Sequence, residues 1–495
     1  MSSLAQAERM LPRRSALVWL APVQAAAVFT VLAIVGGAQM LRAWLLSALV
    51  WVLALPILVS LEAGLVAMML FEPLRGLIRR SQYLIVEYAT QDPIHLVSPI
   101  VTVMALVVLL RSRRLTIFLA TPLAGSVSLL GLIYILEIFN PLQGTLFAGF
   151  AGALFLLVPL VWFYFGQTVP EEFLVTALRL VIILGLLTSL YGVYQLVFGY
   201  PGFEQYWIEN TEFYESIHVG NVERALATFS SAEEWGRYTE IGAIAAFGFA
   251  AGAKRIKARA GWLACGAALS GFVLLTGQRT AVFGLMLGVT VLVLLGGRSF
   301  KSVLARFALL ALPVVLVIAF VKPPTAEEMW SKGDDQTVST LLLHTQRGTL
   351  EPVGEESLQE RFKNWSYLLT SVIPSRPLGA GLGAGNLGQR RFNSDYDYPP
   401  IDNSIIQLAI ACGIPGALLF ISILSRTTWL AFRQARRTPP DDPSAPVARM
   451  LAAIISALVL NSVFGLTFTI YSIAPLAWLM IGRISSNSVR QHVEA

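Results

Sequence analysis

Charged side chains are scarce in this sequence. Asp, Glu, Lys and Arg make up only 13% of the 495 residues, whereas hydrophobic residues make up 56%. Soluble globular domains carry about 25% charged residues. The low charge therefore excludes an ordinary soluble domain. The net charge of +6 comes from short basic clusters between apolar blocks, so it does not indicate a nucleic-acid partner.

Cysteine and histidine are also rare. The two cysteines, Cys265 and Cys412, both lie inside apolar blocks, and the four histidines are scattered without metal-ligand spacing. We interpret the cysteines as small core residues. The sequence thus predicts no disulfide, no metal site and no cofactor.

Long apolar blocks are what the sequence has in abundance. A block of about 18 or more apolar residues is typical of a membrane-spanning helix. The blocks lack the alternation of barrel strands, so helices are favoured. We predict an all-α, polytopic integral membrane protein with about 12–14 transmembrane helices and a large periplasmic loop that contains short helices. The blocks cover residues 16–36, 44–70, 94–110, 115–138, 144–165, 174–198, 238–253, 259–277, 281–297, 303–321, 404–424, 447–467 and 470–483.

The orientation follows from the Lys and Arg clusters between these blocks. The clusters at 111–114, 254–259, 298–306 and 426–437 fall on one side, which we assign to the cytoplasm. Arg75, Arg79 and Arg80 do not fit this assignment. We expect the segment 71–93 to be an amphipathic interfacial helix, in which basic residues are tolerated.

Two long outward-facing loops hold most of the polar residues. They divide the chain into five predicted regions: N-terminal transmembrane helices at 1–198, a first loop at 199–237, central transmembrane helices at 238–321, a large loop at 322–403, and C-terminal transmembrane helices with a cytoplasmic tail at 404–495. The large loop contains a helical pattern at 358–373 and a glycine-rich run at 379–386. That run lacks the preceding strand and the Lys-Ser/Thr of a phosphate-binding loop.

Arg279 is the strongest candidate for a functional residue. It follows Thr276-Gly277-Gln278 in a tight connection between two apolar blocks, near the predicted outer surface. Charges at membrane depth are costly and usually functional. A guanidinium here suits a phosphate ligand. The alternative is an arginine that reaches the lipid headgroups.

Two further arginines lie in the outer loops. Arg224 is in the first loop, and Arg361 is in the helical part of the second. Each alone is typical of a solvated loop residue. Three arginines on one face, next to aromatic residues, would instead hold a diphosphate.

Asp402 and Asn403 stand where a helix would begin before the block at 404–424. Helix capping alone explains both residues. An Asp at the outer mouth of a span would also orient or deprotonate a sugar hydroxyl. Both interpretations stay open. Deep in the spans, only Glu62 and Glu137 stand out as ionisable residues.

These residues resemble the O-antigen ligase and polymerase superfamily of bacterial membrane glycosyltransferases. The likeness covers about residues 190–425. It is carried by Tyr191-Gly192-Val193-Tyr194-Gln195, Arg224-Ala225-Leu226-Ala227-Thr228-Phe229, Gly277-Gln278-Arg279-Thr280-Ala281, Pro377-Leu378-Gly379-Ala380-Gly381-Leu382-Gly383, Asp402-Asn403-Ser404 and Gly413-Ile414-Pro415-Gly416.

The resemblance implies an inverting, metal-independent transfer of glycan from undecaprenyl diphosphate at the periplasmic face of the bacterial inner membrane. It implies that Arg224, Arg279 and Arg361 bind the donor diphosphate. From their places in the sequence we further expect Asp402 and Arg279 to be catalytic and Asn403 to contact substrate. The implied partners are the undecaprenyl-diphosphate-linked glycan and the lipid bilayer, with a chain-length regulator as a further candidate.

The branch of the superfamily stays open at the sequence level. The ligase branch often has His before the Asn at the mouth of the span, where this chain has Asp402. This departure favours a polymerase of O-antigen or exopolysaccharide repeat units over a ligase that moves glycan to lipid A core. A transporter or flippase is the alternative from another class. Such proteins tend to show internal repeats and ionisable residues deep in their spans.

Overall fold

The computed structural model describes residues 40–84, 92–111, 121–211, 217–219, 222–296, 356–385, 398–439 and 441–493. The chain divides into two compact units. The first unit comprises residues 1–120 and 200–214, and the second comprises 121–199 and 215–495. The apolar blocks predicted at 16–36 and 303–321 lie outside the described residues.

The first unit consists of short helices. Its elements are α4 (Met40–Ala54), η2 (Leu55–Leu58), α5 (Leu61–Phe71), η3 (Glu72–Leu74), α6 (Arg75–Ser81), η4 (Gln82–Leu84), η5 (Pro93–Leu96), α7 (Val97–Arg111) and α13 (Gly202–Asn210). The predicted block at 44–70 is therefore two helices. Pro56 lies in the 3-10 turn between them, and Ser60 caps α5 by accepting a hydrogen bond from the Ala63 amide.

The prediction that 71–93 is an interfacial helix with tolerated basic residues is wrong, because the arginines of α6 do not lie at a membrane surface. Arg75, Arg79 and Arg80 are all buried, and each pairs with a carboxylate. Arg80 Nε lies 2.6 Å from Glu204 Oε1 on α13, and Arg79 Nε lies 3.3 Å from Asp92 Oδ2. These charges are neutralised inside the protein, so they give no information about the positive-inside rule.

The second unit contains the long helices. Its elements are α9 (Ala124–Glu137), η6 (Pro141–Gln143), α10 (Leu146–Leu160), α11 (Trp162–Thr168), α12 (Glu171–Phe198), β1 (His218–Val219), β2 (Val222–Glu223), α15 (Ala232–Gly252), α16 (Ile256–Leu275), α17 (Arg279–Gly296), α21 (Glu356–Tyr367), η8 (Leu368–Val372), α22 (Ile373–Ser375), α24 (Ser404–Arg437), α25 (Ala445–Val463), η9 (Thr467–Thr469) and α26 (Ala474–Val493). The strands β1 and β2 form an antiparallel hairpin.

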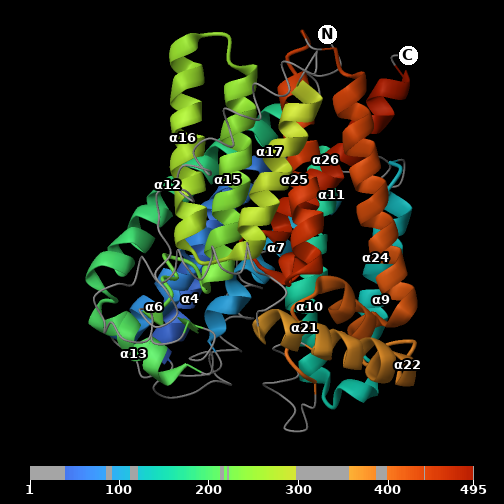
Figure 1. Ribbon diagram of the computed structural model, residues 1–495. Helices are drawn as coiled ribbons and strands as arrows, with labels where there is room; N and C mark the ends of the chain where they lie inside the picture. The colour runs from blue at the N-terminus through green and yellow to red at the C-terminus, as the bar shows by residue number, and fades with distance from the viewer. Residues whose placement is uncertain are drawn as a thin grey trace. The chain divides into compact units, whose positions relative to one another are not determined.

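Close helix packing defines the core of the second unit. Helix α15 packs on α12 and α16, and α25 packs on α17 and α24 (Figure 1). Helices α11 and α26 approach so closely that a Cβ on Gly166 would meet the Leu479 carbonyl. The apolar side chains and small residues on these faces supply the burial that holds the bundle together.

Helix α24 is broken in its first third, and the backbone at the break forms hydrogen bonds with the glycine-rich run. Gly413 has φ 71°, and Pro415 follows it. The unwound turn leaves carbonyls that the run satisfies: the Ala380 amide donates to Ile410 O at 2.8 Å and the Gly381 amide to Ala411 O at 3.2 Å. The glycines thus allow the backbone of the run to approach the backbone of α24 closely. The run does not form a phosphate-binding loop.

Seven helices in the described part of the chain are long and apolar enough to cross a membrane. They are Pro93–Arg111, Leu146–Thr168, Glu171–Phe198, Ile256–Leu275, Arg279–Gly296, Ser404–Arg437 and Ala445–Val463, beside shorter apolar helices at Leu46–Leu58 and Ala124–Glu137. The all-α, polytopic membrane fold is confirmed.

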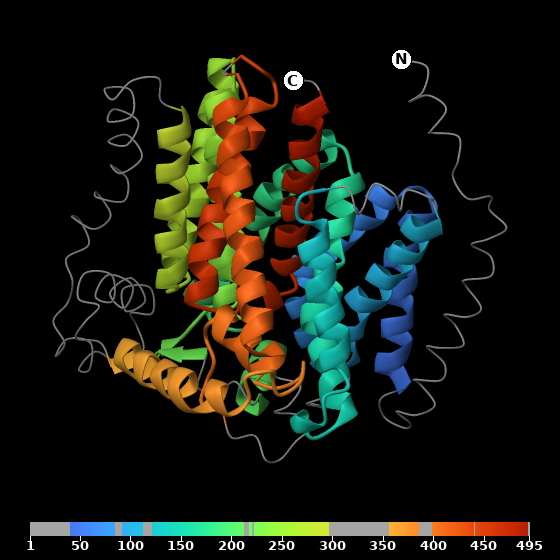
Figure 2. The same cartoon turned by 90° about the vertical axis from the view of Figure 1, so that its right-hand side faces the viewer.

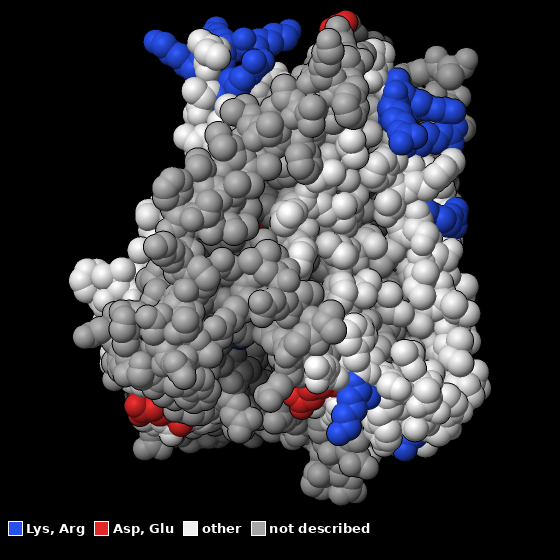
Figure 3. Space-filling model, viewed as in Figure 1, with Lys and Arg blue, Asp and Glu red and all other residues white. Residues whose placement is uncertain are grey.

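The two ends of the second unit differ in character. Helices α21 and α22 lie across one end, at a steep angle to the long helices (Figure 2). Lys and Arg gather at the opposite end, where α15 joins α16 and where α24 stops (Figure 3). The residues there are Lys254, Arg255, Lys257, Arg259, Arg436 and Arg437, and all are exposed.

Candidate functional site

The side chain of Gln195, near the end of α12, holds the loop that carries Arg224. Its Oε1 accepts hydrogen bonds from the Leu226 and Ala227 amides at 3.2 and 2.7 Å, and its Nε2 donates to the Ala227 carbonyl at 3.1 Å. Ala227 adopts φ 50°, which is unusual for a residue with a Cβ. Two motifs that are far apart in the sequence thus form one structural unit that positions Arg224.

Gly277 places Arg279 at the start of α17. Gly277 has φ 67°, the left-handed conformation that commonly ends a helix, and it follows directly after α16. Thr276 Oγ1 accepts a hydrogen bond from the Gln278 amide, which fixes the turn. Arg279 is then the first residue of α17 and is half-buried.

Arg361 on α21 pairs with Asp402. Arg361 Nε lies 2.5 Å from Asp402 Oδ2, and Trp365 Nε1 donates a hydrogen bond to Asp402 Oδ1 at 2.9 Å. The helix predicted at 358–373 is confirmed as α21 with its continuation into η8 and α22. One helical turn of α21 therefore presents two donors to one carboxylate.

The three predicted arginines converge, although they come from three separate segments. The positive charges of Arg361 and Arg224 both act on Arg279. Burial lowers the pKa of the Arg224 guanidinium, the charge of Arg361 lowers it further, and the charge of Glu233 raises it. Mutual repulsion of this kind is relieved when an anion binds. The arrangement suits a ligand with two or more negative charges.

Asn403 has a structural role in α24. Its Oδ1 accepts hydrogen bonds from the amides of Ile405 at 2.9 Å and Ile406 at 3.0 Å, and its side chain is buried. Asn403 is thus the N-cap, one of the two interpretations left open by the sequence. Asp402 is not the cap, because its carboxylate faces Arg361 and Trp365.

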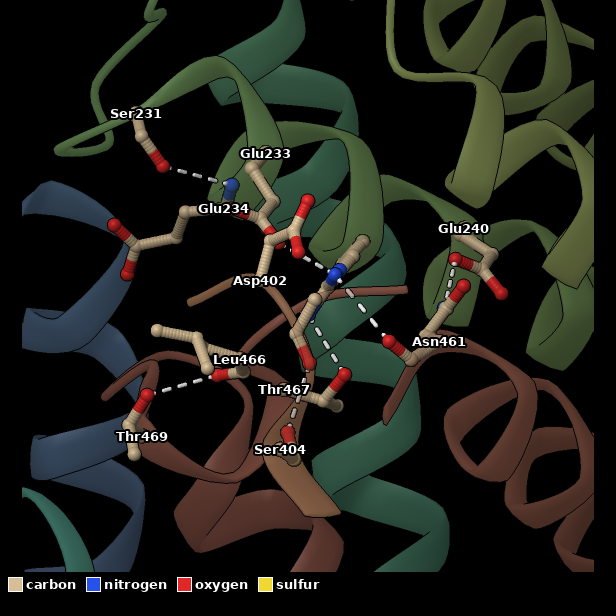
Figure 4. Close-up of polar contacts among 12 residues, drawn as sticks. Ser231, Glu233, Glu234, Glu240, Asp402, Ser404, Asn461, Leu466, Thr467 and Thr469 are labelled. Carbon is tan, nitrogen blue, oxygen red and sulfur yellow. Dashed lines mark hydrogen bonds and ion pairs between the residues drawn. The ribbon is translucent and has the colours of Figure 1, made fainter. Parts of the chain in front are cut away.

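The polar residues on the first turns of α15 were not predicted from the sequence. The predicted loop ended at 237, whereas the helix begins at Ala232. Arg237 is fully buried: its Nη2 lies 2.5 Å from Glu233 Oε1 and its Nη1 donates to Thr467 Oγ1 at 2.6 Å. Figure 4 shows Glu233, Glu240, Asn461 and Thr467 grouped at this point.

Glu240, one turn further along α15, is also buried. Asn461 Nδ2 on α25 donates to Glu240 Oε2 at 2.8 Å. The expectation that only Glu62 and Glu137 are deep ionisable residues is therefore wrong. The signal was present in the sequence, because Glu233, Arg237 and Glu240 are spaced by four and three residues, one face of a helix that leads into an apolar block.

Comparison with known protein families finds a match in the second half of the chain. Residues 263–421 match the O-antigen ligase family. This match, over about a third of the chain, supports the O-antigen ligase and polymerase superfamily. The matched segment includes Arg279, Arg361 and Asp402, as well as the break in α24. No curated protein matches the chain.

The similarity to this family supports a coarse function for the chain. O-antigen ligases and polymerases are membrane proteins of polysaccharide biosynthesis that act on lipid-linked glycans. The superfamily assignment made from the sequence motifs is thereby confirmed, together with a multi-pass membrane location.

Proposed function

We propose that this protein is a polysaccharide polymerase that joins undecaprenyl-diphosphate-linked repeat units. The observation that carries the proposal is the convergence of Arg224, Arg279 and Arg361 beside Asp402. A diphosphate that leaves an anomeric carbon needs stabilisation of its developing charge, and preorganised guanidinium groups supply it. The superfamily supports a lipid-linked glycan as the substrate.

The charge of the site matches that of the donor. Arg224, Arg279 and Arg361 lie close enough for their positive charges to act on one another, and Asp402 pairs with Arg361. A diphosphate diester carries one negative charge on each phosphate, so its charge is opposite to that of this arginine group.

The proposed reaction is a single inverting displacement. A hydroxyl of the acceptor repeat unit attacks the anomeric carbon of the donor, the new glycosidic bond forms, and the bond from that carbon to the diphosphate oxygen breaks. The electron pair of the broken bond stays on the diphosphate. Arg279 and Arg224 stabilise this leaving group, while Asp402 holds Arg361 within reach of it.

Asp402 favours a polymerase over a ligase. It occupies the position at which the ligase branch often carries His. Both of its oxygens are engaged, one by Trp365 and the other by Arg361. A neutral imidazole could not form this charged pair, so the residue difference changes how Arg361 is held. Transfer to lipid A core or another acceptor by a ligase is the second candidate.

The distribution of charge supports a periplasmic site at the inner membrane. Helices α15, α17 and α24 all begin at the end that carries Arg279 and Asp402. The exposed basic residues at 254–259 and at Arg436 and Arg437 lie at the opposite ends of the same helices. Cytoplasmic loops carry the excess of Lys and Arg, so the arginine site would face outward.

A transporter or flippase is the remaining alternative. The buried Arg237 and Glu240 are residues that such proteins often have at depth. Both are bonded to neighbouring helices, however, and Arg237 is paired with Glu233 at the edge of the arginine site. These contacts support a structural role beside an enzymatic site.

The test is reconstitution of the purified protein in liposomes with lipid-linked repeat units from its own host, followed by sizing of the lipid-linked products. A ladder at successive repeat numbers is the expected result. Transfer only after lipid A core or another acceptor is added would indicate a ligase. Movement of intact lipid-linked units across the bilayer without new glycosidic bonds would indicate a flippase.

A further inference from the structure

Two adjacent glutamates at the start of α15 have different surroundings. Glu234 forms a cap that is similar to a capping box: Ser231 Oγ accepts from the Glu234 amide at 3.1 Å, and Glu234 Oε2 accepts from the amide of Ser230, one residue before the N-cap, at 3.0 Å. Its side chain is buried. Glu233 takes no part in this cap, and its side chain is 36% exposed.

Glu233 is held by a fixed partner and keeps one oxygen available. Its Oε1 pairs with Arg237, which is itself fully buried and bonded to Thr467. Among the described residues, no hydrogen bond is recorded for its Oε2. The carboxylate is therefore anchored at one oxygen while the other remains open to a ligand.

Gly465 connects this carboxylate to the mouth of α24. The carbonyl of Gly465 accepts hydrogen bonds from the Ser404 amide at 3.2 Å and from Ser404 Oγ at 2.8 Å. A Cβ on Gly465 would meet Arg237 Nη2 and Glu233 Oε1. The backbone at Gly465 thus lies against the ion pair on one side and against the start of α24, two residues after Asp402, on the other.

We propose that Glu233 is the proton acceptor of the reaction, the carboxylate that binds the attacking hydroxyl of the acceptor glycan. Asp402 is less suited to that task because Arg361 and Trp365 occupy both of its oxygens. Glu233 lies close enough to Arg224 for its charge to act on that guanidinium. An acceptor hydroxyl at Glu233 would therefore be next to a donor diphosphate at Arg224. This inference rests on the proposed function.

The proton balance of the step is simple. Glu233 Oε2 accepts a hydrogen bond from the acceptor hydroxyl and takes its proton as the oxygen bonds to the anomeric carbon. The diphosphate leaves with the electron pair of the broken bond, and the arginines stabilise it. The protonated Glu233 then releases its proton to water, which its partial exposure permits. Arg237 acts only as a positioning residue, because it restrains Glu233.

The experiment compares Glu233→Gln, Glu233→Ala and Glu234→Gln in liposomes with the host's lipid-linked repeat units. Glu233→Gln retains the size of the side chain and can still accept a bond from Arg237. We expect its turnover to fall by about 100-fold or more, the contribution typical of a general base. Donor binding should remain within about threefold, because the diphosphate ligands are unchanged. Glu234→Gln keeps an acceptor for Ser230 and is expected to remain active.

Chemical rescue separates catalysis from structure. Added formate is expected to restore part of the turnover of Glu233→Ala, since a small carboxylate can enter the vacated space and take the proton. Turnover of Glu233→Gln within threefold of the wild type, or a loss in Glu233→Ala that formate leaves unchanged, would overturn the inference. Failure of the proposed function is distinguishable, because the wild-type protein would then bind the donor and form no glycosidic bond.

Discussion

Arg361 and Asp402 form an ion pair between two segments that are forty-one residues apart in the sequence, with Nε and Oδ2 separated by 2.5 Å. The pair joins α21, which lies across the end of the helix bundle, to the residue that precedes the N-cap of α24. Because Arg361 lies near Arg224 and Arg279, the pair also fixes one corner of the proposed diphosphate site.

Replacement of Arg279 by Ala should remove most of the activity. The guanidinium is proposed to stabilise the leaving diphosphate, and removal of one such donor costs about 100- to 1000-fold in turnover. Glycan polymerisation in reconstituted liposomes measures the effect. Arg255→Ala, which removes an exposed arginine at the opposite end of the second unit, should leave the rate unchanged. Equal activity of the two variants would contradict a role for Arg279 in catalysis.

Replacement of Asp402 by Asn should reduce activity far more than stability. Both partners of the ion pair are partly exposed, 37% for Arg361 and 27% for Asp402, so the pair contributes only about 0.2–1 kcal/mol to stability. Release of Arg361 would misplace a proposed diphosphate ligand, and we expect the turnover rate to fall by about 100-fold. Thermal unfolding measures the loss of stability, and a turnover assay on the same preparation measures the loss of activity. A large fall in melting temperature with little change in turnover would show that the pair is purely structural.

Replacement of Arg237 by Met should destabilise the second unit. Arg237 is fully buried, and its loss leaves Thr467 Oγ1 without its donor and Glu233 without its ion-pair partner. We expect a loss of about 1–3 kcal/mol, the cost of leaving buried polar groups unsatisfied. Unfolding in detergent micelles measures it. Arg376→Met is the matched control, because Arg376 is exposed and, among the described residues, its side chain bonds only the hydroxyl of Tyr398. Equal melting temperatures would contradict the structural role.

Replacement of Gly413 by Ala should distort the break in α24. The residue has φ 71°, and a methyl group there would meet the backbone of Pro377 and Leu378. Backbone strain of this kind costs about 1–3 kcal/mol. The control is Gly271→Ala on α16, where a methyl group meets nothing within 4 Å. Expression level and melting temperature should fall for the first variant and hold for the second.

The proposed orientation can be tested by labelling single cysteines. In a protein whose Cys265 and Cys412 are replaced by Ala, we expect Lys363→Cys on α21 to react with an impermeant maleimide added outside spheroplasts. Lys257→Cys should react only after the membrane is permeabilised. Both lysines are exposed. The reverse pattern would place the arginine site in the cytoplasm.

The fold was largely predictable because long apolar blocks correspond directly to helices. The blocks at 174–198, 259–277 and 281–297 correspond to α12, α16 and α17 within a few residues. The start of α15 was misplaced because Glu233, Arg237 and Glu240 make its first turns resemble a loop in a hydropathy plot. Their burial depends on partners on other helices and on the connection after α25, which a local pattern does not contain.

The candidate site was predictable in part. Arg224, Arg279 and Arg361 were predicted as one group, and the structure brings them together. The pairing of Arg361 with Asp402 was not foreseen, since it depends on how α21 lies across the bundle. Asn403 was left between capping and substrate contact, and only the geometry of its two hydrogen bonds identifies the cap.

The hydrogen bonds between the glycine-rich run and the break in α24 have a consequence for protein engineering. The Ile414 amide also donates to Pro377 O, so the run and the break are joined on both sides of Gly413. An exchange of the large loop between related proteins that stops before Ser404 would cut through these bonds. A chimera intended to transplant substrate preference should therefore carry the loop together with the start of α24, as far as Gly416. The residue equivalent to Arg361 would then be transferred together with the helix start that anchors it.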